Sequence, residues 1–393
     1  MTASIKDKVA IIGIGCTRFG ERWDKNAEDL MVDAVYEALE DAGLESKDIQ
    51  AAWLGVHTSF GTGQPLAQAV KLEYIPITRV ENACATGSDA FRNACYAVAA
   101  GVYDIVLATG VEKLKDSGMT GLVGGGGGAG TNISPPTPPP VQFALAAQRY
   151  AHHYGVKAED LKKALARIAV KNHHNGSLNP KAHFQREITL EQALNAPIIA
   201  TPLGLFDCCG VSDGGAAAII TRPEIARQLR PDYVLVKGLG LTCGGRQGTL
   251  QSAYDFVHFE ENVTAARQAY QQAGVNNPLK DIDHAEVHDC FSITELIIYE
   301  DLGWAPRGRG PEYVTNGVFD LEGELAVNPD GGLKCFGHPI GASGIRMMYE
   351  VYKQLQGKAG PRQRKNPTLG LTHNLGGTPG SFTCAVSILG GRD

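Results

Sequence analysis

The sequence predicts an α/β fold made of two similar halves, and three observations point to it. Short apolar runs typical of strands alternate with amphipathic segments typical of helices, as in a parallel or mixed sheet covered on both faces. The chain has 393 residues, too many for one ordinary core, and 48 of them are glycines that often stand at strand-to-helix turns. The order of elements in the first half also returns in the second half, which favours an internal duplication.

The first half supplies its elements in a regular order. Val9–Ile14 is apolar and rich in β-branched residues, which indicates a buried strand. A helical pattern follows from Ala27 to Ala42, and Gly43 is placed to end it. We expect further strands at Ala51–Val56, Ile75–Val80 and Asp104–Thr109, and a helix at Cys84–Ala100 closed by Gly101.

The second half repeats this order. Each half has a helix that ends in Ala-Gly, followed by an apolar residue, a polar loop and Asp-Ile, in which the Asp is Asp48 or Asp281. The segment Gly337–Gln356 then corresponds to the Cys84 helix, and a strand at Thr368–Thr372 comes after it. We expect the two halves to pack into one layered body whose equivalent helices meet near a pseudo-dyad.

The pattern weakens between the halves. Gly124–Gly128 and Ser134–Pro140 cannot form regular structure, whereas Phe143–Tyr154 and Lys171–Ile188 are patterned. A surface loop and a loop domain over a site are both open interpretations of this stretch. The predicted division is residues 1–112 for the first part of the N-terminal half, 113–201 for an inserted loop domain, 202–231 for the completion of the N-terminal half and 232–393 for the C-terminal half.

Composition excludes several classes of function. Lys and Arg number 36 against 42 Asp and Glu, a formal charge of −6, and no basic run stands out, so we expect no nucleic-acid binding. No stretch approaches the ~18 apolar residues of a membrane span. Nine irregularly spaced cysteines, with no secretory or retention signal, are typical of reduced thiols in a cytoplasmic protein. No dinucleotide or Walker loop is present, so NAD and ATP chemistry are disfavoured.

Cys84 is the first candidate nucleophile. It lies in the small-residue turn Glu81–Asp89, between a predicted strand and a predicted helix. The unpaired N–H groups and the dipole of a helix N-terminus favour an anion, so we expect a lowered thiol pKa. The small neighbours also leave room for an acyl group. The alternative is a buried structural cysteine.

His338 is the candidate base. By the internal repeat, Gly337–Gly344 is the second copy of the Cys84 turn, so the pseudo-dyad brings a thiol and an imidazole together. A helix N-terminus disfavours imidazolium, which keeps His338 neutral and able to accept the proton of Cys84. This is the arrangement of covalent catalysis. The alternative is a histidine that caps its own helix.

Two further segments follow predicted strands. His288 comes after the strand Ala285–Val287 and is placed to donate a hydrogen bond to a substrate oxygen, and Cys290 is placed to shuttle a proton. The alternatives are a supporting histidine and a core cysteine. The glycines of Asn374–Gly380 expose backbone N–H groups that can stabilise an oxyanion, although tight turns use glycine equally.

Two groups of residues are expected to be structural. Cys208 and Cys209 precede a buried strand and are interpreted as part of a turn. The histidines of the middle region lack the Cys/His spacing of a zinc site, so we expect no metal. They are His152, His153, His173, His174 and His183.

Several blocks resemble the signature blocks of the thiolase superfamily. They are Asn82–Ser88, Gly337–Gly344 and Asn374–Gly377, and the likeness extends over nearly the whole chain, including Ser212–Ala218. The block His288–Phe291 resembles the branch of sterol-carrier-protein-type and archaeal acetoacetyl-CoA thiolases. The resemblance implies a five-layered αβαβα fold with an inserted loop domain, a homodimer or higher oligomer, and CoA thioesters as substrates.

The resemblance also implies roles for the residues that match the motifs. Cys84 would be acylated and His338 would activate it. His288 and His338 would polarise the thioester oxygen, and the backbone N–H groups of Cys84 and Gly376 would form the second oxyanion hole, which holds the acyl-enzyme carbonyl.

One departure concerns the acid/base cysteine. Many thiolases have a second catalytic cysteine where this chain has Asn374. In the sterol-carrier-type branch, the cysteine that matches Cys290 takes that task.

The implied activity is cleavage of a 3-oxoacyl-CoA by free CoA, or the reverse Claisen condensation, with CoA as a substrate and no permanently bound cofactor. Lys171, Lys181 and Arg186 are candidate phosphate contacts and Asn374 a further substrate contact, against the alternative of a solvated basic face. The segment Gly124–Pro140 would reshape the acyl pocket for an aromatic or branched substrate, unless it has no role in the site.

Other hypotheses compete with thiolysis. A related condensing enzyme of the ketoacyl synthase type uses similar Cys-His-His or Cys-His-Asn sets. An aldol lyase needs no nucleophilic cysteine, so the intact Cys84 block argues against it. A non-catalytic acyl-CoA-binding subunit would bind without becoming acylated. The resemblance also implies a small zinc-ribbon/OB-fold partner subunit, which would carry any zinc.

Overall fold

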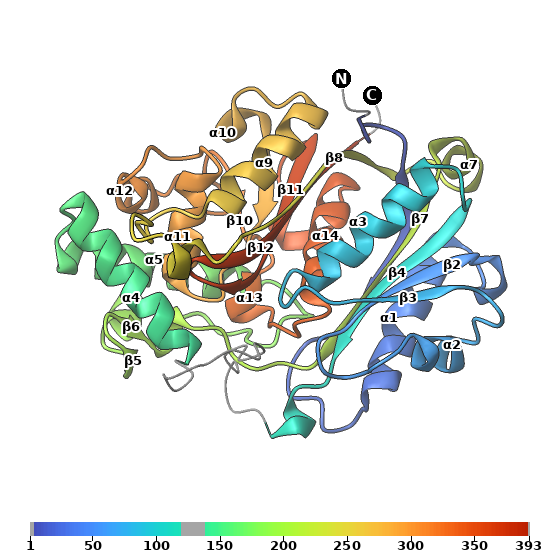
Figure 1. Cartoon of the computed structure of the whole chain (residues 1–393), viewed down its shortest axis with the longest axis horizontal. Coiled ribbons are helices and arrows are strands. Elements are labelled where there is room, and N and C mark those ends of the chain that lie inside the picture. The colour runs from blue at the N-terminus through green and yellow to red at the C-terminus, as the bar shows by residue number, and fades with distance from the viewer. Residues whose placement is uncertain (1–3, 119–137, 392–393) are drawn as a thin grey trace.

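The chain folds into two α/β halves with an inserted helical region. The computed structural model describes residues 4–118 and 138–391. In Figure 1 the N-terminal half, in blue, lies on the right, and the C-terminal half, in orange and red, lies towards the upper left. The helices of the inserted region, in green, lie beside the C-terminal half.

The N-terminal half contains the elements that the sequence predicts, with small shifts at their ends. Gly43 ends the first helix with a φ of 68°, as expected. The helix after Cys84 begins at Thr86, so Cys84 lies just before it. The elements are β1 (Ala10–Cys16), α1 (Ala27–Ala42), β2 (Ala51–Gly55), α2 (Gln64–Val70), β3 (Ile77–Val80), α3 (Thr86–Ala99), β4 (Ile105–Glu112), β7 (Gly214–Thr221) and α7 (Pro223–Leu229).

The C-terminal half has its counterparts. The predicted segment Gly337–Gln356 contains the helix α14 (Ser343–Leu355), and the predicted strand at Thr368 extends to Thr378 as β11 (Leu369–Thr378). The other elements are β8 (Val234–Cys243), α8 (Gln247–Leu250), α9 (Glu260–Ala273), α10 (Pro278–Asp281), β9 (His284–Glu286), α11 (Ser292–Asp301), α12 (Gly310–Thr315), β10 (Ala326–Val327), α13 (Gly332–Cys335) and β12 (Ser381–Gly390).

The sheet confirms the duplication. Its order is β10-β9-β11-β12-β8-β1-β7-β4-β2-β3, so each half contributes its own strands in a matching spatial order on either side of the β8–β1 junction. The halves join where β1 and β8 pair antiparallel, with Ala10 opposite Leu235 and Ile11 opposite Val234. Strands β2, β3 and β4 are parallel and β7 is antiparallel to β4, so the sheet is mixed.

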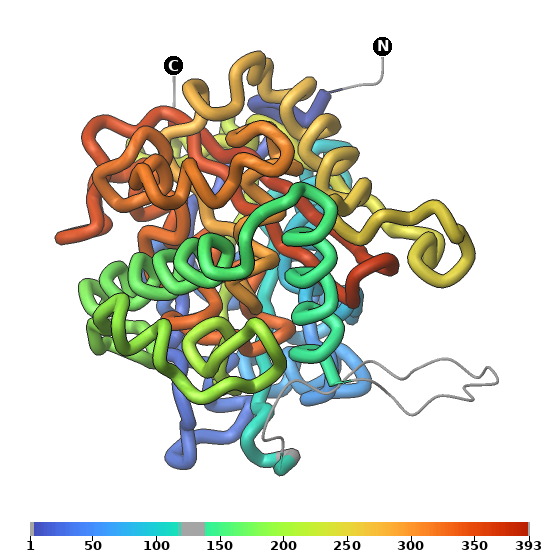
Figure 2. Tube along the Cα trace, turned by 90° about the vertical axis from the view of Figure 1, so that its left-hand side faces the viewer, coloured from blue at the N-terminus to red at the C-terminus, as the bar shows by residue number. Residues whose placement is uncertain are grey.

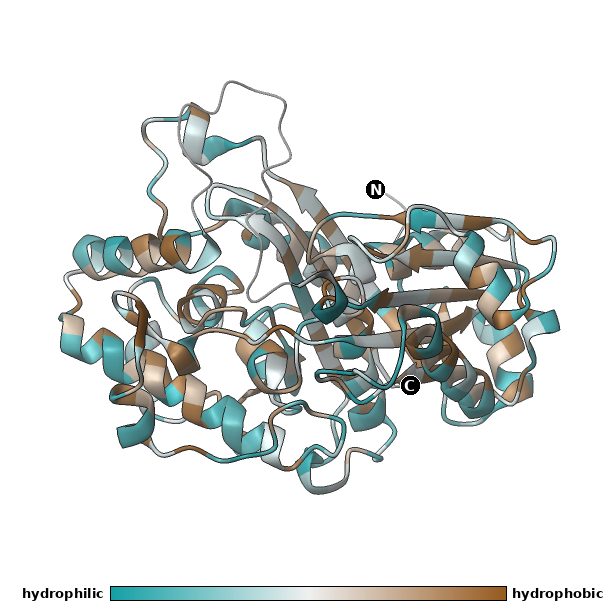
Figure 3. Cartoon of the chain, turned by 90° about the horizontal axis from the view of Figure 1, so that it is seen from below, coloured by the Kyte–Doolittle hydropathy of each residue, from teal (hydrophilic) through white to brown (hydrophobic). Residues whose placement is uncertain are grey.

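The layers follow from which helix covers which strands. Helix α1 packs on β1 and β7, and α9 packs on β8 and β12, on the outer faces. Helices α3 and α14 contact each other, and both contact strands of both halves, so they form the central layer. The five-layer αβαβα arrangement is confirmed. In Figure 3 hydrophobic residues follow the strands and the inward sides of the helices.

The two central helices begin against each other. A Cβ built on Gly87 would lie 2.8 Å from the carbonyl oxygen of Gly341, and one built on Gly344 would lie 2.3 Å from the backbone nitrogen of Ser88. Neither position has space for a side chain, which explains why both turns contain glycine there. This contact brings the Cys84 turn and the His338 turn together.

The inserted region runs past its predicted end. It contains α4 (Pro139–Tyr154), α5 (Ala158–Ser177), α6 (Leu190–Leu194), β5 (Ile198–Ala200) and β6 (Leu203–Gly204). Because β5 and β6 pair as a hairpin, the predicted boundary between residues 201 and 202 is wrong and the region continues towards β7. Helix α5 packs on α11, α12 and α13, and Figure 2 shows these green segments in front of the C-terminal half.

Some predictions fall outside the described residues. The glycine run 124–128 and most of the proline-rich stretch 134–140 lie outside the described residues, so the predicted role of the segment Gly124–Pro140 stays a prediction. Within residues 4–118 and 138–391, no helix is long and apolar enough to cross a membrane.

Candidate active site

Cys84 stands on a strained turn between β3 and α3. The residue before it, Ala83, has a φ of 48°, in the left-handed region that side chains disfavour. The turn is held by the backbone N–H of Ala85, which donates to the carbonyl of Asn82 over 3.1 Å. The N–H of Asn82 in turn donates to the Thr86 hydroxyl at 2.8 Å. The turn places Cys84, a residue of intermediate exposure, just before α3.

The structure brings Cys84, His288 and His338 together. The sulfur of Cys84 and one ring nitrogen of each histidine lie within 4.8 Å of one another. The two rings meet edge to face, with centroids 5.2 Å apart and planes at 84°. The three residues come from the turn before α3, the loop after β9 and the turn before α14, so the fold assembles the cluster from both halves.

His338 is a neutral imidazole. Its side chain is fully buried, and its Nδ1 lies 2.7 Å from the hydroxyl oxygen of Ser343. That hydroxyl donates its single hydrogen to the carbonyl of Pro339 at 2.9 Å, so it accepts from Nδ1–H. Burial, aided by the charge of Arg346, lowers the pKa of His338 to about 3. The expected neutral state is therefore confirmed, with burial as its main cause.

The other ring nitrogen of His338 carries the lone pair. Its Nε2 is buried and has no hydrogen-bond partner in the part of the chain that the structure describes. A neutral imidazole has one N–H, which here is on Nδ1, so Nε2 is free to take a proton.

The expectation of a lowered pKa for Cys84 is wrong. The surrounding protein shields the sulfur from water, and this burial raises the pKa of the Cys84 thiol to about 12. The neighbouring Cys209 and Glu81 raise it further, because each would repel a thiolate at Cys84 when ionised. Cys84 also precedes α3 rather than forming its first turn, so the dipole of α3 does not outweigh the loss of water. The thiol is protonated near neutral pH and needs a base.

Ser343 should be needed for this tautomer. Replacing Ser343 with alanine removes the acceptor of Nδ1–H, so His338 loses its fixed orientation, and we expect acylation of Cys84 to slow by about 10-fold or more. The measurement is the rate of acyl-enzyme formation by quenched-flow mass spectrometry. Ser177→Ala is the control, because the Ser177 hydroxyl caps an exposed carbonyl of α5. An unchanged rate in Ser343→Ala would contradict the assigned tautomer.

His288 is the second buried histidine of the cluster. Its Nδ1 lies 3.4 Å from the amide nitrogen of Asn374. Burial lowers the pKa of His288 well below its usual range, and the neighbouring His338 lowers it further, so His288 is also neutral. Because Nδ1 is occupied, Nε2 is the nitrogen left to face a ligand.

Cys290 lies next to the cluster. Its thiol is buried 3.7 Å from the hydroxyl of Thr294, and its backbone carbonyl accepts from the N–H of Cys209 at 2.9 Å. Burial raises the pKa of the Cys290 thiol, and the proximity of the Cys84 thiol, which would repel a second thiolate, is the next cause. A protonated thiol beside Cys84 is placed to give a proton.

Gly376 contacts the Cys84 turn directly. A Cβ built on Gly376 would lie 2.9 Å from the Cys84 backbone nitrogen and 2.4 Å from the Asn82 carbonyl oxygen. Only glycine fits, and its backbone lies beside that of Cys84. This is the arrangement expected for an oxyanion hole made by the two N–H groups.

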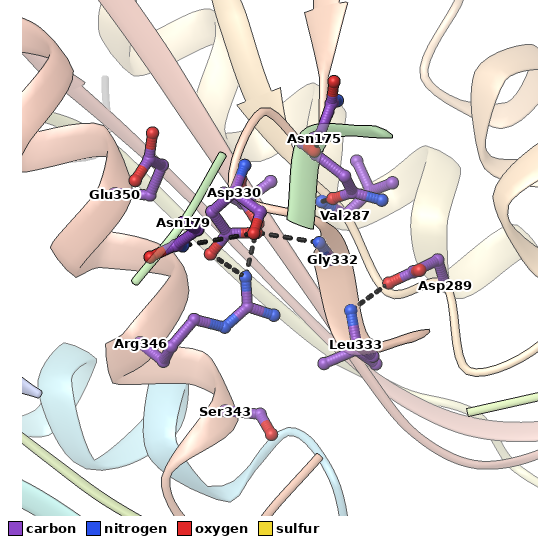
Figure 4. A network of polar contacts seen from close by, with 12 residues as sticks. Asn175, Asn179, Val287, Asp289, Asp330, Gly332, Leu333, Ser343, Arg346 and Glu350 are labelled. Carbon is purple, nitrogen blue, oxygen red and sulfur yellow. Dashed lines mark hydrogen bonds and ion pairs between the residues drawn. The ribbon is translucent and has the colours of Figure 1, made fainter. Parts of the chain in front are cut away.

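A buried polar network supports the His288 loop and the His338 turn, and Figure 4 shows it. Arg346 on α14 forms ion pairs with Glu286 at 2.5 Å and Asp330 at 2.6 Å, and all three side chains are fully buried. Asp289, next to His288, accepts from the Leu333 N–H at 2.5 Å at the start of α13. The network therefore ties β9 to the segment that leads to His338.

The predicted phosphate contact is wrong for Lys171, and that of Lys181 stays a prediction. The ammonium group of Lys171 is buried and bonds Glu295 at 2.5 Å and the Val327 carbonyl at 2.7 Å. The ammonium group of Lys181 bonds both carboxylate oxygens of Glu37 at 2.6 Å. Both charges are paired with a carboxylate of the chain, Lys171 in the interior and Lys181 near the surface. Arg186 is exposed, so its role stays a prediction.

An apolar cavity of about 370 Å³ opens beside the cluster. Cys209, which bonds Cys290, lines it together with Phe291, the residue after Cys290. Phe184 and Phe206 complete the aromatic part of its lining. The sequence pattern assigned Cys209 to a structural turn and did not indicate the aromatic residues of the cavity. The signal that could have found them is their place next to the recognised blocks: Phe206 shortly precedes Ser212–Ala218, and Phe291 ends the block that begins at His288.

The immediate surroundings of Cys84 are aliphatic. Its side chain packs against a small buried cluster of Leu114, Val211 and Ile340.

Thiolate and imidazole are also zinc ligands, and within the described residues Cys84, His288 and His338 are the group placed to share a metal ion. The expectation of no metal therefore stays a prediction.

Family models match the two halves. The thiolase N-terminal domain matches residues 9–224, and the thiolase C-terminal domain-like family matches residues 245–390. The chain belongs to the thiolase family. It is accordingly an acyltransferase, as the resemblance implied.

Individual relatives of this thiolase cover nearly the whole chain. An acetyl-CoA acetyltransferase of Methanothermobacter thermautotrophicus is 39% identical over 388 residues, which cover 97% of this chain and 98% of the relative. Sterol carrier protein 2 of Bos taurus is 32% identical over 398 residues, 95% of this chain and 70% of that protein. These relatives confirm the archaeal and sterol-carrier-type resemblance.

A solved structure has the same fold. The Ltp2-ChsH2(DUF35) aldolase matches this thiolase with a TM-score of 0.85 and 28% identity, over 98% of each chain.

Proposed function

We propose that this thiolase cleaves a 3-oxoacyl-CoA with free CoA, or catalyses the reverse condensation, through an acyl-Cys84 intermediate. The observation that carries the proposal is the cluster of Cys84, His288 and His338 within 4.8 Å. In it, Nε2 of His338, which has no hydrogen-bond partner among residues 4–118 and 138–391, is the base for a thiol whose pKa is about 12. A nucleophile and a base in this relation are the requirement of covalent catalysis.

In the first step, Nε2 of His338 takes the proton of Cys84, and the thiolate attacks the 3-keto carbon. The negative charge on the keto oxygen is stabilised by the backbone N–H groups of Cys84 and Gly376. The C2–C3 bond then breaks. Its electron pair leaves as the enolate of acetyl-CoA, and the acyl group stays on the sulfur.

In the second step, Cys290 gives its proton to C2 of the enolate, whose thioester oxygen is held by His288 and protonated His338. Acetyl-CoA leaves and free CoA enters. The CoA thiol passes its proton to the Cys290 thiolate and attacks the acyl group. The Cys84 sulfur leaves and recovers its proton from His338, which closes the cycle.

The surroundings suggest how the substrate binds. We assign the apolar cavity of about 370 Å³ to the pantetheine arm of CoA, because Cys209 and Phe291 line it next to Cys290. The acyl group on Cys84 would lie against Leu114, Val211 and Ile340. This aliphatic cluster favours a short or branched acyl chain.

The proposal is tested by intact mass after incubation with a panel of acyl-CoAs, followed by peptide mapping. We expect one adduct, on Cys84, that disappears on addition of free CoA. Cys84→Ala should abolish both the adduct and turnover. Cys243→Ala is the matched control, because Cys243 is exposed at the end of β8. An adduct at another residue, or undiminished turnover in Cys84→Ala, would reject the proposal.

The same assay separates the alternatives. A ketoacyl synthase-like enzyme would form the adduct but would require a carrier-bound malonyl donor in place of free CoA. A non-catalytic subunit would bind acyl-CoA without an adduct. The solved relative is named an aldolase, and aldol chemistry in this chain would proceed unchanged in Cys84→Ala.

We further propose that the chain forms a homodimer or higher oligomer and works with a small zinc-ribbon/OB-fold subunit. Strand β3 is an edge of the sheet and leads into the Cys84 turn, so a second copy has a strand to pair with. The solved relative is named for a pair, Ltp2 and ChsH2(DUF35), which supports a second subunit here. Full activity of the purified homodimer alone would count against the partner.

A further inference from the structure

Asn374 joins the two halves at the active site. It lies in the middle of β11, paired with Ala385 of β12, and its side chain is fully buried. Its amide oxygen lies 3.2 Å from the hydroxyl of Ser88 on α3, and its amide nitrogen lies 3.4 Å from Nδ1 of His288. Both ends of the amide are used inside the protein. This arrangement differs from the expected substrate contact.

The two hydrogen bonds determine where His288 carries its proton. The Ser88 hydroxyl donates to the amide oxygen of Asn374, which turns the NH₂ group towards His288. An NH₂ group only donates, so Nδ1 of His288 must accept. A neutral imidazole carries one hydrogen, which therefore lies on Nε2.

The two histidines of the cluster thus hold opposite tautomers. His338 carries its hydrogen on Nδ1, towards Ser343, and presents a lone pair at Nε2. His288 accepts at Nδ1 and presents an N–H at Nε2. One ring is equipped to take the proton of Cys84, and the other to donate to a substrate oxygen.

We propose that Ser88 and Asn374 are positioning residues that hold His288 as a permanent hydrogen-bond donor for the thioester oxygen. The inference rests on the proposed thiolase function and adds the two residues that orient the donor. Neither touches the substrate; both act through His288.

Packing keeps the two hydrogen bonds from Ser88 to Asn374 and from Asn374 to His288, here called the relay, in place. A Cβ built on Gly344 would lie 2.4 Å from the Ser88 hydroxyl oxygen and 2.5 Å from the amide oxygen of Asn374. The start of α14 therefore closes over the hydrogen bond and leaves no space for another partner. The glycine that lets the central helices meet also encloses the relay.

The relay should matter for one half of the chemistry only. Exchange of an acyl group between Cys84 and CoA places the reacting oxygen at the backbone N–H groups of Cys84 and Gly376. Breaking the C2–C3 bond places the enolate oxygen at His288. Loss of the donor should therefore slow the carbon–carbon step and spare the exchange.

The kinetic test compares the two reactions in the wild-type chain, Ser88→Ala and Asn374→Leu. We expect the kcat for 3-oxoacyl-CoA cleavage to fall by about 10–100-fold in Asn374→Leu, the usual effect of losing a group that orients an active-site histidine. The kcat for cleavage should fall less in Ser88→Ala, because the Asn374 amide is still present and can turn either its nitrogen or its oxygen towards His288. Exchange of the acyl group with labelled CoA should keep its wild-type rate in both. Thr372→Val, a change at a buried threonine on the same strand, is the control.

The direct test is the tautomer itself, read by ¹⁵N NMR of histidine-labelled protein and assigned with His288→Gln. We expect His288 protonated at Nε2 in the wild type. Ser88→Ala should populate the Nδ1–H form, because the freed amide can turn its oxygen to the ring. Nδ1–H in the wild type, or equal losses of exchange and cleavage in the folded variants, would overturn the inference.

These outcomes differ from failure of the proposed function. A wild-type chain that neither exchanges acyl groups nor cleaves 3-oxoacyl-CoA would reject the thiolase proposal. The NMR spectrum would still decide the tautomer of His288 in that case.

Discussion

Replacing His338 with alanine is expected to slow acylation of Cys84 by about 10²–10⁴-fold, the usual contribution of a general base. The reason is the pKa of the Cys84 thiol, which burial raises to about 12. At pH 7 a thiol with that pKa is ionised to only about one part in 10⁵, so the reaction depends on Nε2 of His338. The measurement is the rate of acyl-enzyme formation in single-turnover experiments.

The pH dependence gives the sharper result. The pKa of His338 is about 3, so the base is already neutral above pH 5 and wild-type acylation should be flat from about pH 6 to 9. Without the base, the rate follows the thiolate fraction and rises about tenfold per pH unit towards the thiol pKa of about 12. His284→Gln, at another buried neutral histidine, should keep the flat profile. A flat profile in His338→Ala would show that another group takes the proton.

Replacing Arg346 with methionine is expected to lower the free energy of unfolding by about 3–5 kcal/mol, the usual loss when one partner of a buried ion pair is removed. Arg346 lies between Glu286 at 2.5 Å and Asp330 at 2.6 Å, and all three side chains are fully buried. Its loss leaves two carboxylates close together without a counter-charge. Urea unfolding followed by fluorescence measures the change.

Two comparisons make this prediction specific. Adding Glu286→Gln and Asp330→Asn to Arg346→Met should recover most of the loss, because neutral groups replace the uncompensated charges. Arg22→Met removes an ion pair with Asp24, whose side chain is 62% exposed, and should cost less than about 1 kcal/mol. Equal losses in Arg22→Met and Arg346→Met would contradict the role of burial.

The duplicated fold could be predicted from the order of the elements. Each half repeats a helix that ends in Ala-Gly and a glycine-rich turn before a central helix, and these local patterns depend on near neighbours in the chain. Gly87 belongs to the Cys84 turn and Gly344 to the His338 turn, and the structure shows that the two central helices meet at these glycines. Pairing Cys84 with His338 followed from that symmetry.

Charges and protons could not be predicted in the same way. Helix dipole reasoning predicted a lowered pKa for Cys84, but the pKa depends on how much water the folded chain removes from the sulfur, and burial raises it. Lys171 was expected to meet phosphate, but its ammonium group is buried against Glu295, 124 residues further along the chain. A sequence pattern reports the type of a side chain and leaves its partner open.

By itself, the sequence determined the two α/β halves, the turns that carry Cys84 and His338, and the family to which they belong, because backbone preferences and apolar periodicity act over short distances along the chain. Only the tertiary structure decided which groups are charged and which ring nitrogen holds a proton. The contact between Ser88 and Asn374 spans 286 positions and exists only after the halves close on each other. Protonation depends on burial and on such distant neighbours.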